Sequence, residues 1–172
     1  MKPYRMQCYV ARLDDAERIN AALIADFQAL RNDPDLKRSH YFGGRYENIY
    51  IPRSRIPALA PVLNAAKAAA AAYLRRSGEE LSVGYWFNEM GPGHSTLPHS
   101  HDEDDELASC VYYVRVPENS GELILRQGVL ATHVTPVEGE FVFFSPKTVH
   151  EVTENKSQQM RLSLAMNFGT HE

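Results

Sequence analysis

Apolar residues recur at helical spacing in the first part of the chain and at strand spacing in the second. Asp14 or Asp15 can cap a helix that ends near Pro34. The apolar positions of this helix are Ile19, Leu23, Ile24, Phe27 and Leu30. A second helix is predicted over residues 55–76, before Gly78, because this segment is rich in alanine, a strong helix former. One face of it carries Leu59, Val62, Leu63 and Tyr73.

Short strand patterns surround these helices. Residues 4–13 alternate loosely, and residues 47–51 have the pattern of a short strand. Residues 41–46 combine aromatic side chains with the flexible pair Gly43-Gly44. We expect a connecting loop there, with a loop on the substrate side of a site as the alternative.

From residue 81 onward the apolar period becomes that of strands. The predicted strands cover residues 81–88, 108–116, 122–126, 131–135, 141–144 and 160–168, with turn signals such as Asn119-Ser120-Gly121 between them. Six or more strands after two helices predict a mainly β, α+β fold: a jelly roll (double-stranded β-helix) core with helices packed on one sheet. We expect a single domain over residues 1–172, in which residues 1–80 pack on a core built by residues 81–172.

Alternation along two of these strands separates an apolar face from a polar or small one. In the last strand Arg161, Ser163, Ala165 and Asn167 share one face, and the residues between them are apolar. Ser109, Val111 and Tyr113 share a face of an earlier strand in the same way. These faces are suited to a wet pocket, although a strand with one face in solvent has the same pattern.

Composition excludes several classes. The formal charge of −4 and the absence of a basic cluster argue against a nucleic-acid partner. Cys8 and Cys110 are too few for a disulfide framework, and residues 1–6 contain no apolar signal core, so we expect a cytoplasmic protein. The most apolar run, residues 65–74, is interrupted by Lys67 and is too short to span a membrane, so we expect no membrane partner.

Three histidines form the most informative chemical pattern. His99 and His101 are two positions apart, so that their side chains point to the same side of an extended strand, and His150 would come from another strand. Imidazole suits iron, zinc, copper and nickel, and three such ligands leave coordination positions open for chemistry. The alternative is that these histidines only decorate the acidic loop of residues 102–106.

Five segments then follow one another in the order of a known family. They are His99-Ser100-His101, residues 109–114, residues 117–123, residues 139–146 leading to His150, and residues 161–168. Through these segments, residues 85–168 resemble the bacterial and phage members of the iron(II)/2-oxoglutarate-dependent dioxygenase superfamily, in the prolyl-hydroxylase-like branch that contains His-x-His.

The resemblance implies roles for individual residues. Fe(II) would be held by His99, His101 and His150, and 2-oxoglutarate and O2 would take the remaining positions. Arg161 lies eleven positions after His150, where the family places a basic residue that grips the distal carboxylate of 2-oxoglutarate, and Tyr113 matches a tyrosine that supports it. The implied reaction hydroxylates a substrate while 2-oxoglutarate is decarboxylated to succinate.

One position departs from the usual family pattern of His-x-Asp or His-x-Glu. Either three histidines bind the metal, or the ligand pair is His101 and Glu103. The segment from Gly93 to Glu106 also matches much of the first cupin motif, with His150 in place of the second motif. A cupin-type metal enzyme and a jelly-roll binding protein without metal therefore remain as rivals.

Other histidines have weaker claims. We expect His94 to lie in a lip of the site and His133 to be structural. The sequence leaves open whether the substrate is a small molecule or a peptidyl group. It also leaves the oligomeric state open, a homodimer included.

Overall fold

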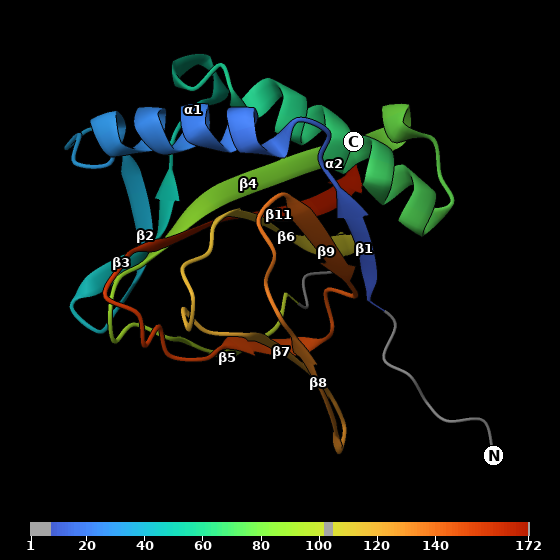
Figure 1. Cartoon of the computed structure of the whole chain (residues 1–172). Coiled ribbons are helices and arrows are strands. Elements are labelled where there is room, and N and C mark those ends of the chain that lie inside the picture. Colours follow the sequence, from blue (N-terminus) through green and yellow to red (C-terminus); the bar gives the residue numbers. More distant parts are fainter. Residues whose placement is uncertain (1–7, 102–104, 172) are drawn as a thin grey trace.

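Two antiparallel sheets face each other, and two helices cover the outer face of the larger one (Figure 1). The structure is a computed structural model and describes residues 8–101 and 105–171. The helices are α1 (Ala16–Leu30) and α2 (Leu59–Leu74). Short 3-10 turns cover Arg53–Arg55 and Gly78–Glu80. This arrangement is the predicted mainly β jelly roll with helices on one sheet.

The major sheet has seven strands in the order β1-β9-β6-β11-β4-β3-β2. Their bounds are β1 (Tyr9–Arg12), β2 (Lys37–Phe42), β3 (Arg45–Tyr50), β4 (Leu81–Met90), β6 (Ala108–Arg115), β9 (Glu140–Phe144) and β11 (Arg161–Thr170). Strand β11 lies between β4 and β6 and pairs with both along most of its length. Strand β1 lies at one edge and β3 and β2 at the other, so the first 80 residues extend on both sides the sheet built by the rest.

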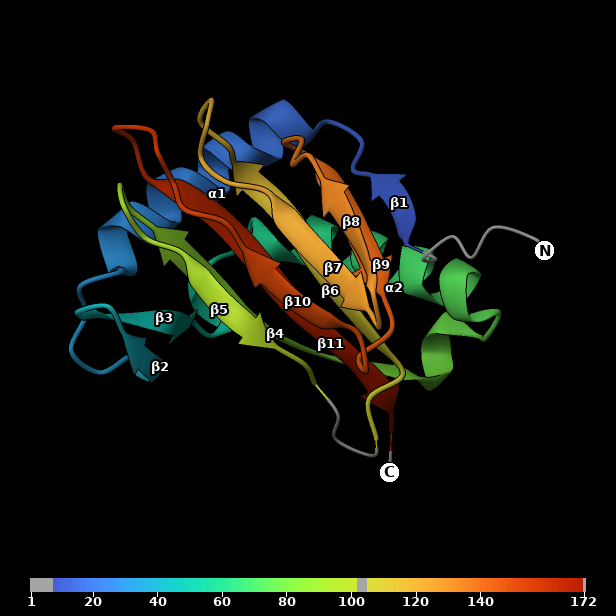
Figure 2. The same ribbon diagram turned by 90° about the horizontal axis from the view of Figure 1, so that it is seen from below.

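The minor sheet has four strands in the order β5-β10-β7-β8, which Figure 2 shows from below. Their bounds are β5 (Thr96–His99), β7 (Leu123–Gln127), β8 (Leu130–Val134) and β10 (Val149–Val152). The space between this sheet and the major sheet contains the pocket described below.

The helices pack through the apolar stripes expected from their sequences. Helix α1 buries Ile19, Leu23 and Phe27, whose spacing of four residues places them on one face. Helix α2 buries two alanines besides its larger apolar residues, and such small side chains let a helix lie close to a sheet. Asp15 is at the N-cap of α1, as expected, but its side chain makes no capping hydrogen bond because its backbone is left-handed, with φ 56°.

The two faces of β11 and β6 are separated as predicted. On β11, Leu162, Leu164, Met166 and Phe168 join the core under the helices. The opposite face of β11 contributes Arg161, Ser163 and Ala165 to the pocket, and that of β6 contributes Val111 and Tyr113. The polar face is therefore an inner wall between the two sheets, and the reading of these strands as exposed to solvent was wrong.

Strands β2, β5 and β10 were not predicted, and the prediction of a loop over residues 41–46 is wrong. Residues 41–46 belong to a hairpin of β2 and β3 at the edge of the major sheet, whose turn is Gly43-Gly44. Strands β5 and β10 are only four residues long and had no clear alternation. Predicted helix and strand ends otherwise agree within a few residues, except that α2 begins at Leu59. In the described part of the chain, no helix is long and apolar enough to cross a membrane.

Candidate metal and cosubstrate site

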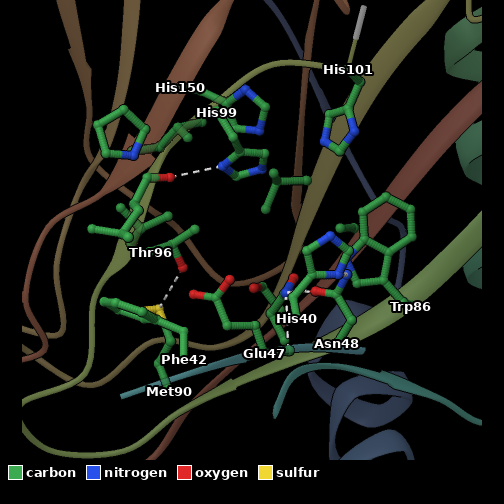
Figure 3. A pocket seen from close by; sticks show the side chains of 18 of the residues that line it. His40, Phe42, Glu47, Asn48, Trp86, Met90, Thr96, His99, His101 and His150 are labelled. Atoms are coloured by element: carbon green, nitrogen blue, oxygen red, sulfur yellow. Dashed lines mark hydrogen bonds between the residues drawn. The ribbon is translucent and has the colours of Figure 1, made fainter. Parts of the chain in front are cut away.

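His99, His101 and His150 converge in the pocket between the sheets (Figure 3). One ring nitrogen of each lies within 4.8 Å of one ring nitrogen of the others. His150 on β10 is the direct cross-strand partner of His99 on β5, and side chains opposite each other in an antiparallel pair are close neighbours. His101 follows β5, where its backbone N–H donates to the carbonyl of Pro146 at 2.9 Å. The strand pairing therefore forms the cluster.

Backbone carbonyls orient two of the three rings. His99 Nδ1 lies 2.8 Å from the carbonyl oxygen of Leu97, and His150 Nδ1 lies 3.0 Å from that of Thr148. Because a carbonyl oxygen only accepts, each Nδ1 carries the proton and donates. The Nε2 lone pairs are then free to bind a metal ion, the arrangement in which a hydrogen bond from the other nitrogen fixes the ligand tautomer.

The environment of the cluster favours neutral imidazoles. Burial lowers the pKa of His150 to about 3, and the neighbouring His99 and His101 add to the effect. Burial, followed by His99 and His40, lowers the pKa of His101 to about 4. Metal binding requires the neutral form, so the cluster is suited to a cation at neutral pH.

A second polar group lies in the same pocket, which has a volume of about 590 Å³. Arg161 is buried on β11 and donates from Nη1 to the carbonyls of Ser120 at 3.2 Å and Gly121 at 2.6 Å. Its Cζ lies 5.4 Å from the ring centroid of Tyr113, which is fully buried on β6. Burial raises the pKa of Tyr113 to about 12, although the nearby guanidinium opposes this rise.

Arg161 and Tyr113 together have unused hydrogen-bonding capacity. Among the described residues, the Tyr113 hydroxyl and Arg161 Nε make no hydrogen bond of good geometry, although the two side chains interact with each other. No carboxylate of the described residues forms an ion pair with Arg161. A buried cation without a counter-ion is strongly unfavourable. The pair therefore has the chemistry to receive a carboxylate, and the residues present fit both a metal ion and an anionic cosubstrate.

The structure separates the remaining candidates from the cluster. His94 accepts a hydrogen bond from the backbone N–H of Gly91 at 2.9 Å and lies in a turn outside the pocket lining. His133 is on β8, where Nδ1 is 3.1 Å from Glu122 Oε2, and it is likewise outside the pocket. Glu103, the alternative ligand, lies outside the described residues.

Sequence reasoning missed the pocket wall opposite the histidines. His40, Glu47 and Asn48 line the pocket from the β2–β3 hairpin, and Trp86 on β4 packs against His101 with ring centroids 5.7 Å apart. Glu47 and Asn48 belong to the segment 47–51 that we predicted as a short strand, and His40 precedes the segment 41–46 that we expected to be a loop. Tyr41 and Phe42 of that segment also line the pocket, in agreement with the alternative of a segment on the substrate side. The polar positions of the hairpin face the pocket only because the hairpin joins the major sheet beside β4.

Comparison with known proteins assigns the class. Residues 85–169, about half of the chain, match the family model described as the 2OG-Fe(II) oxygenase superfamily. A search of curated proteins found no match. This chain is an Fe(II)- and 2-oxoglutarate-dependent oxygenase by its matched region and fold. It belongs to the 2OG-Fe(II) oxygenase superfamily.

Solved structures share the fold at low sequence identity. A Pseudomonas putida prolyl-4-hydroxylase is 22% identical, with a TM-score of 0.74, over 94% of this chain and 92% of that one. A Trichoplax adhaerens prolyl hydroxylase, solved with a hypoxia inducible factor peptide fragment, is 12% identical, with a TM-score of 0.74, over 95% and 83%. EvdO2 from Micromonospora carbonacea, complexed with 2-oxoglutarate, is 15% identical, with a TM-score of 0.70, over 95% and 86%. The match of the family model distinguishes the oxygenase from the cupin and metal-free readings.

Proposed function

We propose that His99, His101 and His150 hold Fe(II) and that Arg161 and Tyr113 bind 2-oxoglutarate, in an enzyme that hydroxylates a substrate and releases succinate. The observation that supports this most is that a cluster of three histidines shares one pocket with a buried arginine that has no carboxylate partner among the described residues. Iron with bound cosubstrate supplies the oxidative chemistry that no amino-acid side chain supplies.

The residues of the chain act by binding and orientation. The carbonyls of Leu97 and Thr148 hold the imidazoles of His99 and His150 with Nε2 free. The guanidinium of Arg161 offers a fork of N–H donors that matches a carboxylate, and the neutral Tyr113 hydroxyl can donate to the same group. The carbonyls of Ser120 and Gly121 fix one arm of that fork, so that the other N–H groups are available.

The proposed metal ligands carry no charge of their own. Most members of the family provide one carboxylate, whereas His101 would replace it with a neutral imidazole in this chain. The charge of Fe(II) would then be balanced by the two carboxylates of the cosubstrate. We also propose a cytoplasmic setting, which the two unpaired cysteines, Cys8 and Cys110, support.

The function is tested by reconstitution of untagged protein with Fe(II) under anaerobic conditions. We expect one Fe(II) per chain, a visible charge-transfer band on addition of 2-oxoglutarate, and succinate release when O2 is admitted. His150→Ala should abolish iron binding, because two ligands remain, while His133→Ala, outside the pocket, should bind iron normally. Iron binding without the band and without succinate would contradict the oxygenase assignment.

A further inference from the structure

The β2–β3 hairpin provides a wall of polar and aromatic side chains opposite the three histidines. His40, Glu47 and Asn48 line the pocket from this hairpin, and Figure 3 shows them across the cavity from His99 and His150. Arg161 lines the same pocket from β11 and is hydrogen-bonded to the turn that contains Gly121. A molecule that enters the pocket beside the metal ligands and the arginine would contact this wall.

The backbone of the hairpin is distorted where it meets the pocket. His40 has φ 58°, a left-handed conformation that is unfavourable for a residue with a side chain. The ladder pairs Ser39 with Asn48 and Tyr41 with Tyr46 in one unbroken register, but His40 and Glu47, which lie opposite each other between these pairs, do not form a ladder pair. Such strain is retained where surrounding contacts compensate for it, and it commonly occurs at functional positions.

A directed chain of hydrogen bonds fixes the proton of His40. Asn88 Nδ2 lies 3.3 Å from the carbonyl oxygen of Glu47, which can only accept, and 3.2 Å from Asn48 Oδ1. The Asn48 amide is thereby oriented so that its Nδ2 donates to His40 Nδ1 at 3.0 Å, and the Ser39 hydroxyl, 2.8 Å from the same nitrogen, can then donate to it as well. With Nδ1 accepting, the neutral ring carries its proton on Nε2. His40 is therefore a hydrogen-bond donor at Nε2.

Glu47 places a carboxylate on the same wall. Its ion pair with Arg45 is long, at 3.5 Å between Oε1 and Nη2, because Arg45 also donates to the carbonyls of Glu89 and Ser95 at 3.0 and 3.2 Å. No hydrogen bond reaches Oε2 of Glu47 from any residue that the structure describes. The carboxylate is nevertheless mostly buried, with 14% of its side chain exposed. It can accept a further charged donor from a ligand.

Among the described residues, Glu47 has one charged partner, Arg45. Of the charged residues that line the pocket in the described structure, Glu47 and Glu106 are acidic and Arg161 is the basic one. Fe(II) and the doubly negative cosubstrate would cancel each other and Glu106 would offset Arg161, so that Glu47 keeps only its long ion pair with Arg45 as a counter-charge. Tyr50 and Trp86 also line the pocket, with ring centroids 6.4 Å apart. Aromatic faces attract cationic nitrogen groups, and Lys37 Nζ already lies 5.0 Å from the centroid of the Tyr50 ring.

We propose that the hairpin wall is a substrate subsite for a cationic nitrogen, of the kind carried by lysyl and arginyl side chains. Glu47 accepts from that nitrogen, and His40 donates from Nε2 to an oxygen of the same substrate. The assignment of this wall to the substrate rests on the proposed function, but binding of a basic group to Glu47 does not depend on turnover. The free amino acid and the same side chain within a peptide offer the same chemistry here.

The test is calorimetric binding of a small panel of probes. The panel contains L-lysine and L-arginine, their neutral counterparts L-norleucine and L-citrulline, and the tripeptides Gly-Lys-Gly and Gly-Arg-Gly. Titrations are run with and without anaerobic Fe(II) and 2-oxoglutarate. We expect the affinity of a basic probe to exceed that of its neutral counterpart by about tenfold or more, because the neutral probe lacks the hydrogen bond between two charged groups. Preference for the free amino acid or for the tripeptide identifies the source of the basic group.

Two variants and a control locate the effect. Glu47→Gln should lower the affinity for the basic probes by about tenfold or more and remove most of the difference in affinity between basic and neutral probes. His40→Asn should lower the affinity for the basic probes about three- to tenfold, because one neutral hydrogen bond is lost. Asparagine is chosen because it tolerates a left-handed backbone. Glu17→Gln, on the exposed face of α1, should change nothing. Neutral probes that bind as tightly as basic ones, or no binding by any basic probe, would overturn the subsite.

These results separate the two proposals. If 2-oxoglutarate is consumed but basic probes have no advantage, the subsite is wrong and the oxygenase function stands. If basic probes bind through Glu47 while succinate is never released, the subsite stands and the proposed function is wrong.

Discussion

In the proposed function, single residues in the pocket bind different ligand groups. Arg161 and the histidine cluster lie on different sheets, and the arginine has its own carbonyl partners in the turn before β7. Loss of one group should therefore leave the geometry of the other largely intact. This separation lets cosubstrate binding and metal binding be measured independently.

Arg161→Ala should weaken 2-oxoglutarate binding by about tenfold or more while iron still binds, because a charged hydrogen-bond donor to the carboxylate is lost. The measurement is a 2-oxoglutarate titration of the anaerobic Fe(II) protein, followed by the charge-transfer band. Arg126→Ala is the matched control, since Arg126 is half-exposed on β7 and pairs with Glu151. An unchanged 2-oxoglutarate affinity in Arg161→Ala would mean that another residue holds the distal carboxylate.

Tyr113 should make stability depend on alkaline pH. Its pKa is raised to about 12 by burial, whereas an unfolded tyrosine titrates near 10. The folded state therefore retains the proton longer, and this contribution is complete below pH 10 and is lost as the pH rises towards 12. Two pKa units correspond to about 2.7 kcal/mol. Denaturant unfolding at pH 9 and pH 11 should show that the free energy of unfolding falls less for Tyr113→Phe than for the native chain. An equal fall in both proteins would contradict a raised pKa of the Tyr113 hydroxyl.

At the scale of elements, the sequence predicted the strands that build the core but not the strands that deliver the ligands. Strand β11 was predictable because its alternation separates a core face from a pocket face over ten residues. Strands β5 and β10 are four residues long, and β5 contains Pro98, which is typical of strand edges. The three histidines were recognised from spacing, yet the register that sets His150 opposite His99 depends on tertiary pairing.

The hairpin residues were missed for a related reason. His40 and Glu47 have side chains that are common in solvent-exposed loops, and only the pairing of β3 with β4 carries them into the pocket. Strand propensity is low in the sequence of β2, which contains Lys37 and Arg38. Arg161 was identified from its position after His150, but its carbonyl partners are forty residues earlier in the chain and no local pattern reveals them.

The turn between β6 and β7 should act as a support for the cosubstrate site. Gly121 has φ +100°, and a Cβ there would lie 2.3 Å from the carbonyl oxygen of Thr153 and 3.4 Å from Arg161 Nη1. Gly121→Ala should therefore displace the turn and weaken 2-oxoglutarate binding while iron binding is retained. Gly128→Ala is the control, because Gly128 also has positive φ, +59°, but its Cβ would meet no atom within 4 Å.

The two glycine variants can be compared in one experiment. Both should lose some stability through backbone strain, of about 1 kcal/mol for a left-handed alanine. Only Gly121→Ala should also raise the concentration of 2-oxoglutarate needed to develop the charge-transfer band. Equal cosubstrate affinity in the two variants would show that the turn does not position Arg161.

At the scale of the whole molecule, the site connects the two sheets. His99 and His150 belong to the minor sheet, and Arg161 and Tyr113 belong to the major sheet, whose other face is covered by the helices. The core under the helices is continuous and apolar, whereas the space between the sheets contains the pocket beside a smaller apolar cluster of Tyr113, Leu123, Leu125, Val142 and Phe144. The minor sheet therefore depends more than the helices do on what occupies that pocket.

Fe(II) and 2-oxoglutarate should stabilise the fold together more than either does alone. A ligand that binds only the folded state adds about 2.7 kcal/mol at one hundred times its dissociation constant. We expect anaerobic thermal unfolding to show a small rise in Tm with Fe(II), almost none with 2-oxoglutarate alone, and a larger rise with both, because the cosubstrate then contacts groups of both sheets. A chelator should reverse the rise. Arg161→Ala should retain the rise in Tm with Fe(II) and lose most of the further rise that 2-oxoglutarate adds. Full stabilisation by 2-oxoglutarate in the absence of metal would show that the cosubstrate binds independently of the histidines.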